Sequence, residues 1–301
     1  MKKVLVTGAS GFFGLAAITE LKERGFEVHA LSRRALPLDG VCWHEVDLLS
    51  SNRMVELLDA TRPSHLLHLA WNVGPGFWTA SDNLDWGALT LRLIRAFHEA
   101  GGQRIVSAGT CAEYDWQDTS PLFISEDHPR GPATLYGHVK DCTRRVQEAF
   151  ALQAGISQAW GVLFMSYGQR ERPERLVPAV IADLLAGRAT RTTSGEQVRD
   201  WLDCRDVGRG FAELLDSQVE GPVNLASGLP VAVRDIILKL GEICGRPDLV
   251  RFGDIASRKG DPSRLVANVD RLSGEVGFRP ARTLDQGLSD AVDWWKSKAI
   301  V

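Results

Sequence analysis

Several features that mark special classes of protein are missing from this sequence of 301 residues. Basic and acidic side chains nearly balance, 35 against 38, so the net charge of −3 gives no general attraction to nucleic acid or to an anionic membrane surface. No apolar run approaches the roughly 18 residues of a membrane span, and the run after the first two lysines is too short for a signal peptide. We therefore expect a cytoplasmic globular protein that binds neither nucleic acid nor a membrane.

Cysteine and tyrosine are both scarce. The five cysteines are scattered and none forms a Cys-x-x-Cys pair, so the sequence supports no metal site, and an odd number of separated thiols suits a reducing compartment. Only three tyrosines, Tyr114, Tyr136 and Tyr167, stand against nine tryptophans. So few tyrosines suggest that each has a specific reason to be present.

Short apolar runs alternate with helical patterns through the first half of the chain. We expect strands over 3–6, 27–31, 65–70, 104–107 and 158–164, and helices over 13–24, 53–60, 83–100 and 136–154. Strands and helices that alternate at this spacing form βαβ units, so the sequence predicts an α/β fold with a doubly wound parallel sheet. Beyond residue 164 strand and helix patterns no longer alternate regularly, and the last helix is expected over 284–298.

The chain has no internal repeat and no low-complexity linker, which predicts two tightly packed lobes. We expect residues 1–164 to form a Rossmann-type nucleotide-binding domain, to which residues 199–227 return. Residues 165–198 and 228–301 are expected to form a smaller, interleaved α/β lobe that binds the substrate.

A glycine-rich segment, TGASGFFG, follows the first expected strand and opens the first expected helix. Gly8, Gly11 and Gly14 allow a tight turn, close approach of the backbone to a pyrophosphate, and packing of the helix on the sheet. The diphosphate then lies against the unpaired N–H groups at the positive end of the helix dipole. The segment predicts a dinucleotide site, although its Gly-x-x-Gly-x-x-Gly order differs from that of ordinary dehydrogenases.

No acidic residue stands where an NAD-specific site usually carries one, about 20 residues further on. The second strand is followed by Ser32, Arg33 and Arg34, and the first acid is Asp39. Because guanidinium groups bind phosphate through paired hydrogen bonds, we expect NADP(H) to be favoured over NAD(H), unless the arginines form only a solvated loop. Asp47 and Leu48 follow a further expected strand and are candidates for the adenine edge.

Tyr136 and Lys140 are four residues apart near the start of an expected helix, so they share one face. A tyrosine with an ordinary pKa of about 10 is a poor acid–base group at neutral pH. A lysine ammonium one turn away and a positively charged nicotinamide both favour the phenolate and lower this pKa. Thr110, just past the strand expected over 104–107, is placed to hydrogen-bond the substrate oxygen.

These motifs together resemble the extended short-chain dehydrogenase/reductase family, the NAD(P)-dependent epimerases, dehydratases and reductases of nucleotide sugars. The matching segments are TGASGFFG at the start, HLA at 68–70, YGHVK at 136–140, LFMSYG at 163–168, EQVRDWLDCRDV at 196–207 and VNLASG at 223–228. The resemblance covers nearly the whole chain and implies that Tyr136 is the acid/base, that Lys140 holds the nicotinamide ribose, and that Thr110 orients the carbonyl. It also implies a homodimer that assembles through long helices.

The resemblance extends the candidate site. Cofactor contacts are expected from Gly8, Ser10, Gly11, Phe12, Phe13, Gly14, Ser32, Arg33, Arg34, Asp47, Leu48, Leu69, Ala70, Trp71, Tyr136, Lys140 and Phe164. Substrate contacts are expected from Thr110, Met165, Arg199, Arg258 and Asp261, where the arginines are to bind the substrate diphosphate; Arg170 and Arg175 are further candidates.

Departures from the family pattern narrow the choice among the reactions that the family catalyses. Dehydratases carry Asp-Glu after the active-site threonine, whereas this chain has Cys111 and Ala112, with Glu113 one place late. Trp71 stands where many relatives have alanine. We expect an NADPH-dependent reductase that acts on the keto group of a nucleotide-linked deoxyhexose, with Tyr136 as proton donor. The alternatives are a 4-epimerase with tightly bound NAD(P) and a cofactor sensor without turnover.

Overall fold

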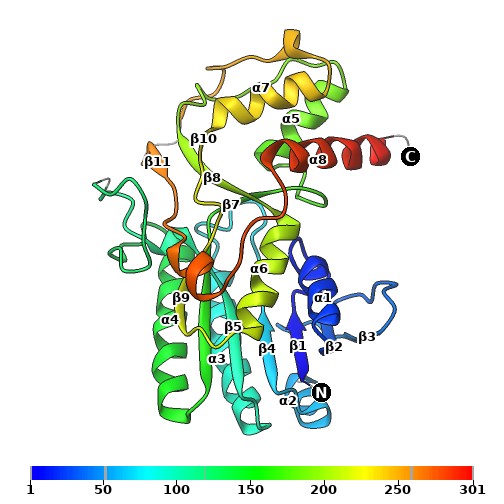
Figure 1. Ribbon diagram of the computed structural model, residues 1–301, viewed down its shortest axis with the longest axis vertical. Coiled ribbons are helices and arrows are strands. Elements are labelled where there is room, and N and C mark those ends of the chain that lie inside the picture. Colours follow the sequence, from blue (N-terminus) through cyan, green and yellow to red (C-terminus); the bar gives the residue numbers. More distant parts are fainter. Residues whose placement is uncertain (1, 51–52, 119, 258–259, 300–301) are drawn as a thin grey trace.

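A seven-stranded parallel sheet forms the base of the computed structural model, which describes residues 2–50, 53–118, 120–257 and 260–299 (Figure 1). Its strands are β1 (Lys3–Thr7), β2 (Glu27–Ser32), β3 (Val41–Glu45), β4 (His65–His68), β5 (Arg104–Thr110), β6 (Ser157–Leu163) and β9 (Gly221–Leu225). They lie in the order β3-β2-β1-β4-β5-β6-β9, and every pairing is parallel. The predicted doubly wound fold is confirmed.

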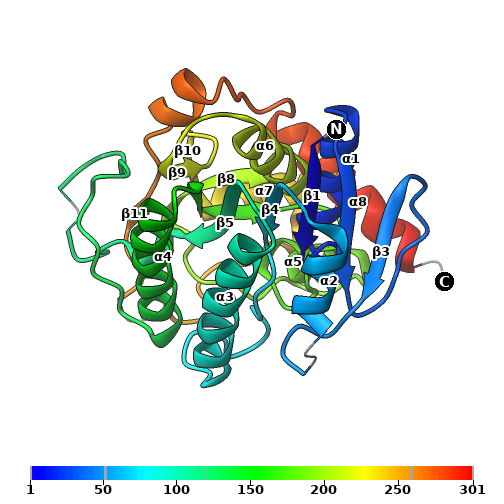
Figure 2. The ribbon, with the colours of Figure 1, turned by 90° about the horizontal axis from the view of Figure 1, so that it is seen from below.

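Helices cover both faces of this sheet, as the view from below shows (Figure 2). One face carries α1 (Gly14–Glu23) and α6 (Cys204–Asp216), and the other carries α2 (Arg53–Thr61), α3 (Asp82–Glu99) and α4 (Leu135–Ala154). The central strands are therefore buried on both sides, which explains why they appear in the sequence as continuous apolar runs. The order of the strands reverses between β1 and β4, the place where doubly wound sheets bind ligands.

A smaller lobe stands over the carboxyl ends of the large sheet's strands (Figure 1). Its short strands are β7 (Met165–Tyr167), β8 (Val198–Asp203), β10 (Pro230–Ala232) and β11 (Arg264–Leu265). Its helices are α5 (Leu176–Leu185), α7 (Val233–Ile243) and α8 (Leu284–Ala299), which share one apolar core. Three single turns, η1 (Cys111–Glu113), η2 (Pro247–Leu249) and η3 (Arg271–Glu275), complete the described elements.

The segment predicted to return to the large sheet returns only in part. Within 199–227, α6 packs on α1 and β9 extends the large sheet beyond β6. Strand β8, however, pairs with β7, β10 and β11 in the small lobe. The return therefore begins at Cys204, because the pairing partners of a strand are set by distant segments that local sequence does not reveal.

Candidate active site

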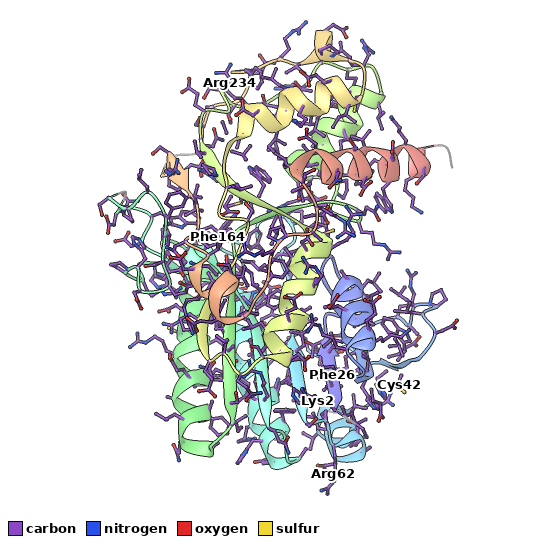
Figure 3. All side chains as sticks on the ribbon, viewed as in Figure 1. Lys2, Phe26, Cys42, Arg62, Phe164 and Arg234 are labelled. Atoms are coloured by element: carbon purple, nitrogen blue, oxygen red, sulfur yellow. The ribbon has the colours of Figure 1, made fainter. Side chains whose placement is uncertain are left out.

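A cleft of about 440 Å³ opens where the large sheet meets the small lobe. Of the predicted site residues, those that line it are Gly8, Ser10, Gly11, Phe12, Phe13, Gly14, Leu69, Ala70, Trp71, Thr110, Tyr136, Phe164 and Met165. Phe164, labelled in Figure 3, lies at the junction of the two lobes, just beyond the end of β6. The cleft thus joins the glycine turn to the predicted acid/base residue.

The glycine turn between β1 and α1 fits a dinucleotide. Gly8 has a left-handed φ of +67°, and a Cβ there would lie 2.9 Å from both the carbonyl carbon of Leu69 and the amide nitrogen of Ala70. A Cβ on Gly14 would overlap the carbonyl oxygen of Gly8. Among the described residues, no side chain caps the start of α1 at Phe13, so the helix terminus is free to bind an anion.

The end of β2 is arranged around one hydroxyl. Ser32 Oγ lies 2.6 Å from Ser10 Oγ on the glycine turn and donates to the carbonyl of Arg34 at 2.8 Å. The side chains of Arg33 and Arg34 are exposed and make no hydrogen bond or ion pair with any residue that the structure describes. These guanidinium groups are therefore available for a phosphate near the glycine turn.

The two candidates for the adenine edge have other surroundings. Asp47 is exposed, and its Oδ1 accepts a hydrogen bond from the backbone of Leu49 at 3.1 Å. Leu48 is buried in the core between the sheet and α2 and α3. Neither lines the enclosed part of the cleft, so their contact with a cofactor stays a prediction.

Tyr136 enters the cleft from the first turn of α4. The Thr134 side chain caps this helix by accepting from the Gly137 amide at 3.2 Å, which fixes where the helix begins. The Tyr136 ring packs edge-on against Phe77, with centroids 4.9 Å apart, and against Trp78 at 5.8 Å. Burial raises the pKa of Tyr136, while a hydrogen bond with Thr110 opposes the rise. In the protein by itself, the effect of burial on the pKa of Tyr136 thus outweighs the lowering that the sequence predicted.

Thr110 is the last residue of β5 and caps the η1 turn. Its Oγ1 accepts from the amide of Ala112 at 3.2 Å, and its own amide donates to Glu113 Oε1 at 2.9 Å. This reciprocal capping box fixes the threonine beside Tyr136. Cys111, the next residue, is a neutral thiol at ordinary pH, because burial raises its pKa to about 12.

Lys140 lies beneath the cleft and is only 3% exposed. Its Nζ donates to the carbonyl of Ala108 at 2.9 Å and lies 3.6 Å from the centre of the Trp71 ring. Trp71 lines the cleft, whereas Lys140 does not. Burial lowers the pKa of Lys140 to about 7, and the charge of Glu113 opposes that fall. The bulky Trp71 thus covers the lysine that the family resemblance assigns to the ribose.

Two of the residues predicted to contact the substrate form an ion pair with each other. Arg199 is 4% exposed, and its guanidinium pairs with Asp261 Oδ1 at 2.7 Å. Neither residue lines the cleft. Arg258 lies outside the described residues. The contact of these residues with a substrate stays a prediction.

The loop after β7 brings further charged groups to the cleft: Arg170, Glu171, Arg172 and Arg175. Arg170 adopts a left-handed φ of +65°, a strained conformation that is commonest at functional sites. Burial raises the pKa of Glu171 to about 8, and its Oε2 has no hydrogen-bond partner among the described residues. Arg170 and Arg175 were expected from the sequence only as further candidates, and Glu171 and Arg172 were not among the predicted residues. The sequence signal that could have indicated these residues is their position directly after LFMSYG, where a strand ends at the cleft.

No helix in the described part of the chain is both long and apolar enough to cross a membrane. Nor do three or more histidine, cysteine, aspartate or glutamate side chains gather there in a way that suits a metal ion.

Comparisons with known proteins extend over nearly the whole chain. The model of a family described as "NAD dependent epimerase/dehydratase family" matches residues 4–226. The UDP-glucose 4-epimerase of Rhizobium meliloti (strain 1021) is 25% identical, covering 97% of this chain and 96% of the relative. A dTDP-glucose 4,6-dehydratase of Xanthomonas campestris pv. campestris is 26% identical, covering 97% and 92%. Among solved structures, MoeE5 in complex with UDP-glucuronic acid and NAD is 29% identical, with a TM-score of 0.84 and coverage of 98% and 99%.

Proposed function

The chain belongs to the NAD-dependent epimerase/dehydratase family, as its motifs predicted, and from this premise we propose that it is a nucleotide-sugar 4-epimerase. One observation carries the proposal: the glycine turn, Thr110 and Tyr136 line a single cleft. Relatives named as 4-epimerases of UDP-sugars support it over the ketoreductase that sequence analysis favoured. A bound nicotinamide dinucleotide supplies reversible hydride transfer at the sugar carbon.

In the proposed reaction, the protein's own residues move the proton. Tyr136 Oη takes the proton of the sugar hydroxyl as that carbon becomes a ketone, and returns it when the ketone is reduced on its other face. Thr110 Oγ1, held beside Tyr136 by the capping box, hydrogen-bonds the same oxygen. The Lys140 ammonium stabilises the phenolate. Arg170 and Arg175, which also line the cleft, are suited to the substrate diphosphate.

The residues after Thr110 argue against dehydration. That reaction needs an acid and a base beside the sugar, and Cys111 is a thiol whose raised pKa keeps it neutral. Ala112 has no polar side chain. Glu113, the last residue of η1, is completely buried and does not line the cleft.

NADPH-dependent reduction of a keto sugar is the second candidate. It is favoured by the exposed guanidinium groups of Arg33 and Arg34 at the end of β2, which have no partner among the described residues and suit the 2′-phosphate of NADP(H). A net reductase uses fresh NADPH, whereas an epimerase recycles one bound cofactor.

A cytoplasmic location and a homodimer formed through α3 and α4 also remain proposals.

A product assay separates the two reactions. The purified protein is incubated with UDP- and dTDP-hexoses in pairs that differ only at C4, and with nucleotide 4-keto-6-deoxyhexoses plus NADPH, and products are identified by NMR. Epimerisation is expected to approach the same mixture from either hexose with no net oxidation of added NADPH. Stoichiometric loss of NADPH with the keto sugars alone would replace the epimerase by the reductase. No conversion of either class would refute both.

A second assay tests cofactor choice. In the Arg33→Ser/Arg34→Ser double variant, loss of charge-assisted hydrogen bonds worth about 1.5–3 kcal/mol each should weaken NADPH binding about tenfold or more. NADH binding should change little. The exposed Arg95 on α3 provides the control substitution Arg95→Ser, which removes a cation that does not line the cleft. Equal losses for both cofactors would contradict recognition of the 2′-phosphate.

A further inference from the structure

Glu113 is a completely buried carboxylate next to the proposed reacting groups, and beyond the capping box with Thr110 the mechanism above gives its charge no part. Its Oε1 accepts from the Thr110 amide at 2.9 Å and from Trp160 Nε1 at 3.0 Å. Its Oε2 lies 3.2 Å from the Arg130 guanidinium and 3.8 Å from that of Arg144. The carboxylate is therefore held by groups from β5, β6, α4 and the loop before α4.

The surrounding structure makes room for this carboxylate. A Cβ added at Gly109 would lie 2.9 Å from Glu113 Oε1 and would also overlap the indole nitrogen of Trp160. Burial raises the pKa of Glu113, whereas Arg130, the hydrogen bonds from Trp160 and Thr110, and Lys140 all oppose the rise. A buried charge that is costly to desolvate is thus compensated on several sides.

Lys140 lies near the same stretch of β5, because its Nζ donates to the carbonyl of Ala108, and both Lys140 and Glu113 approach the Trp160 ring. The groups that face Lys140 come from β4, the loop after it, β6 and η1. The Trp71 and Trp160 rings lie 3.6 and 5.9 Å from Nζ. His68 on β4 is neutral, since burial lowers its pKa to about 3. Glu113 supplies the negative charge that offsets the desolvation of the lysine.

We propose that Glu113 is a positioning residue of the proposed reaction: its carboxylate keeps the buried Lys140 ammonium charged and fixes the turn that presents Thr110 to Tyr136. The effect that this proposal predicts on turnover rests on the proposed function. Without the carboxylate, Lys140 loses its proton at lower pH, and a neutral lysine no longer favours the phenolate of Tyr136. Activity that needs charged Lys140 is lost as pH rises through the pKa of that lysine.

The titration of Lys140 is measured directly by NMR with lysine labelled with ¹³C at Cε, and its signal is assigned by its absence from Lys140→Met. In Glu113→Gln, which can still accept from the Thr110 amide, the midpoint is expected to fall by about one pH unit or more. The matched control is Glu126→Gln, which removes a buried carboxylate that accepts from the Asn224 amide at 2.8 Å. It should leave the midpoint of Lys140 unchanged. An unchanged midpoint in folded Glu113→Gln would overturn the proposal.

The pH profile of turnover gives the second readout. The alkaline limb of kcat/KM should move to lower pH in Glu113→Gln together with the NMR midpoint, whereas a purely structural role would lower activity equally at every pH. If Glu113→Gln does not fold, carboxyl ¹³C NMR of the wild-type protein decides, because a protonated Glu113 at neutral pH overturns the proposal. The NMR titration needs no substrate, so failure of the proposed function leaves this test intact.

Discussion

Replacing Gly8 by alanine should damage both the fold and the cofactor site. Gly8 has φ +67°, where an alanine costs about 1–2 kcal/mol. Its Cβ would also lie 2.9 Å from backbone atoms of Leu69 and Ala70, which cannot move aside as a flexible side chain can. Forcing such an overlap costs about 1–3 kcal/mol more. Gly8→Ala is thus expected to lower the free energy of unfolding by about 2–5 kcal/mol in all.

Gly25 provides the matched control. It has φ +76° after α1, but a Cβ there would meet nothing within 4 Å. Gly25→Ala therefore carries only the backbone cost of about 1–2 kcal/mol. Urea unfolding monitored by tryptophan fluorescence measures both variants, and NADH fluorescence titration measures binding. Only Gly8→Ala should also weaken cofactor binding. Equal destabilisation of the two variants would show that the close contact with the turn after β4 does not matter.

Three further perturbations have defined outcomes. Tyr136→Phe keeps the packing on Phe77 but removes the proton-carrying hydroxyl, so kcat should fall by about 10²–10⁴ while cofactor binding persists; near-normal turnover would exclude its acid/base role. Arg104→Met leaves the carbonyls of Leu214, Leu215 and Val219 without their buried donor and should cost about 3 kcal/mol or more in urea unfolding, against about 0.5 or less for exposed Arg95→Met. Burial lowers the pKa of His68 from 6.5 to about 3. Between pH 6.5 and pH 3 the unfolded chain therefore binds a proton at His68 that the folded protein does not bind, so the free energy of unfolding should fall on acidification below pH 6.5. His68→Gln should make this fall shallower, and an identical slope would refute it.

The sequence predicted the elements whose signals are local. The β1 strand, the glycine turn and α1 follow one another within 24 residues, and their apolar periods and glycine spacing are set by backbone geometry alone. The first-turn position of Tyr136 on α4 was predictable for the same reason. In each case neighbouring residues decide the structure.

Features decided by distant residues were not predictable. Glu113 looked like a displaced member of a motif, and its burial depends on Arg130 and on Trp160, which lies 47 residues away. The position of Lys140 behind the Trp71 ring depends on how α4 packs against the turn after β4. Arg199 was predicted to bind a ligand, and its ion pair with Asp261 was not predictable, because the fold decides which carboxylate lies beside a buried guanidinium.

The contact between α6 and α1 has a consequence for engineering this chain. Gly208 packs so closely on α1 that a Cβ there would lie 2.7 Å from the amide nitrogen of Ala17. A fragment ending at residue 164 would lack α6 and β9, leaving the apolar side of α1 uncovered and the edge of β6 unpaired. Such a fragment should aggregate. A nucleotide-binding half can therefore be cut out, or fitted with another protein's small lobe, only by splicing the chain at several junctions.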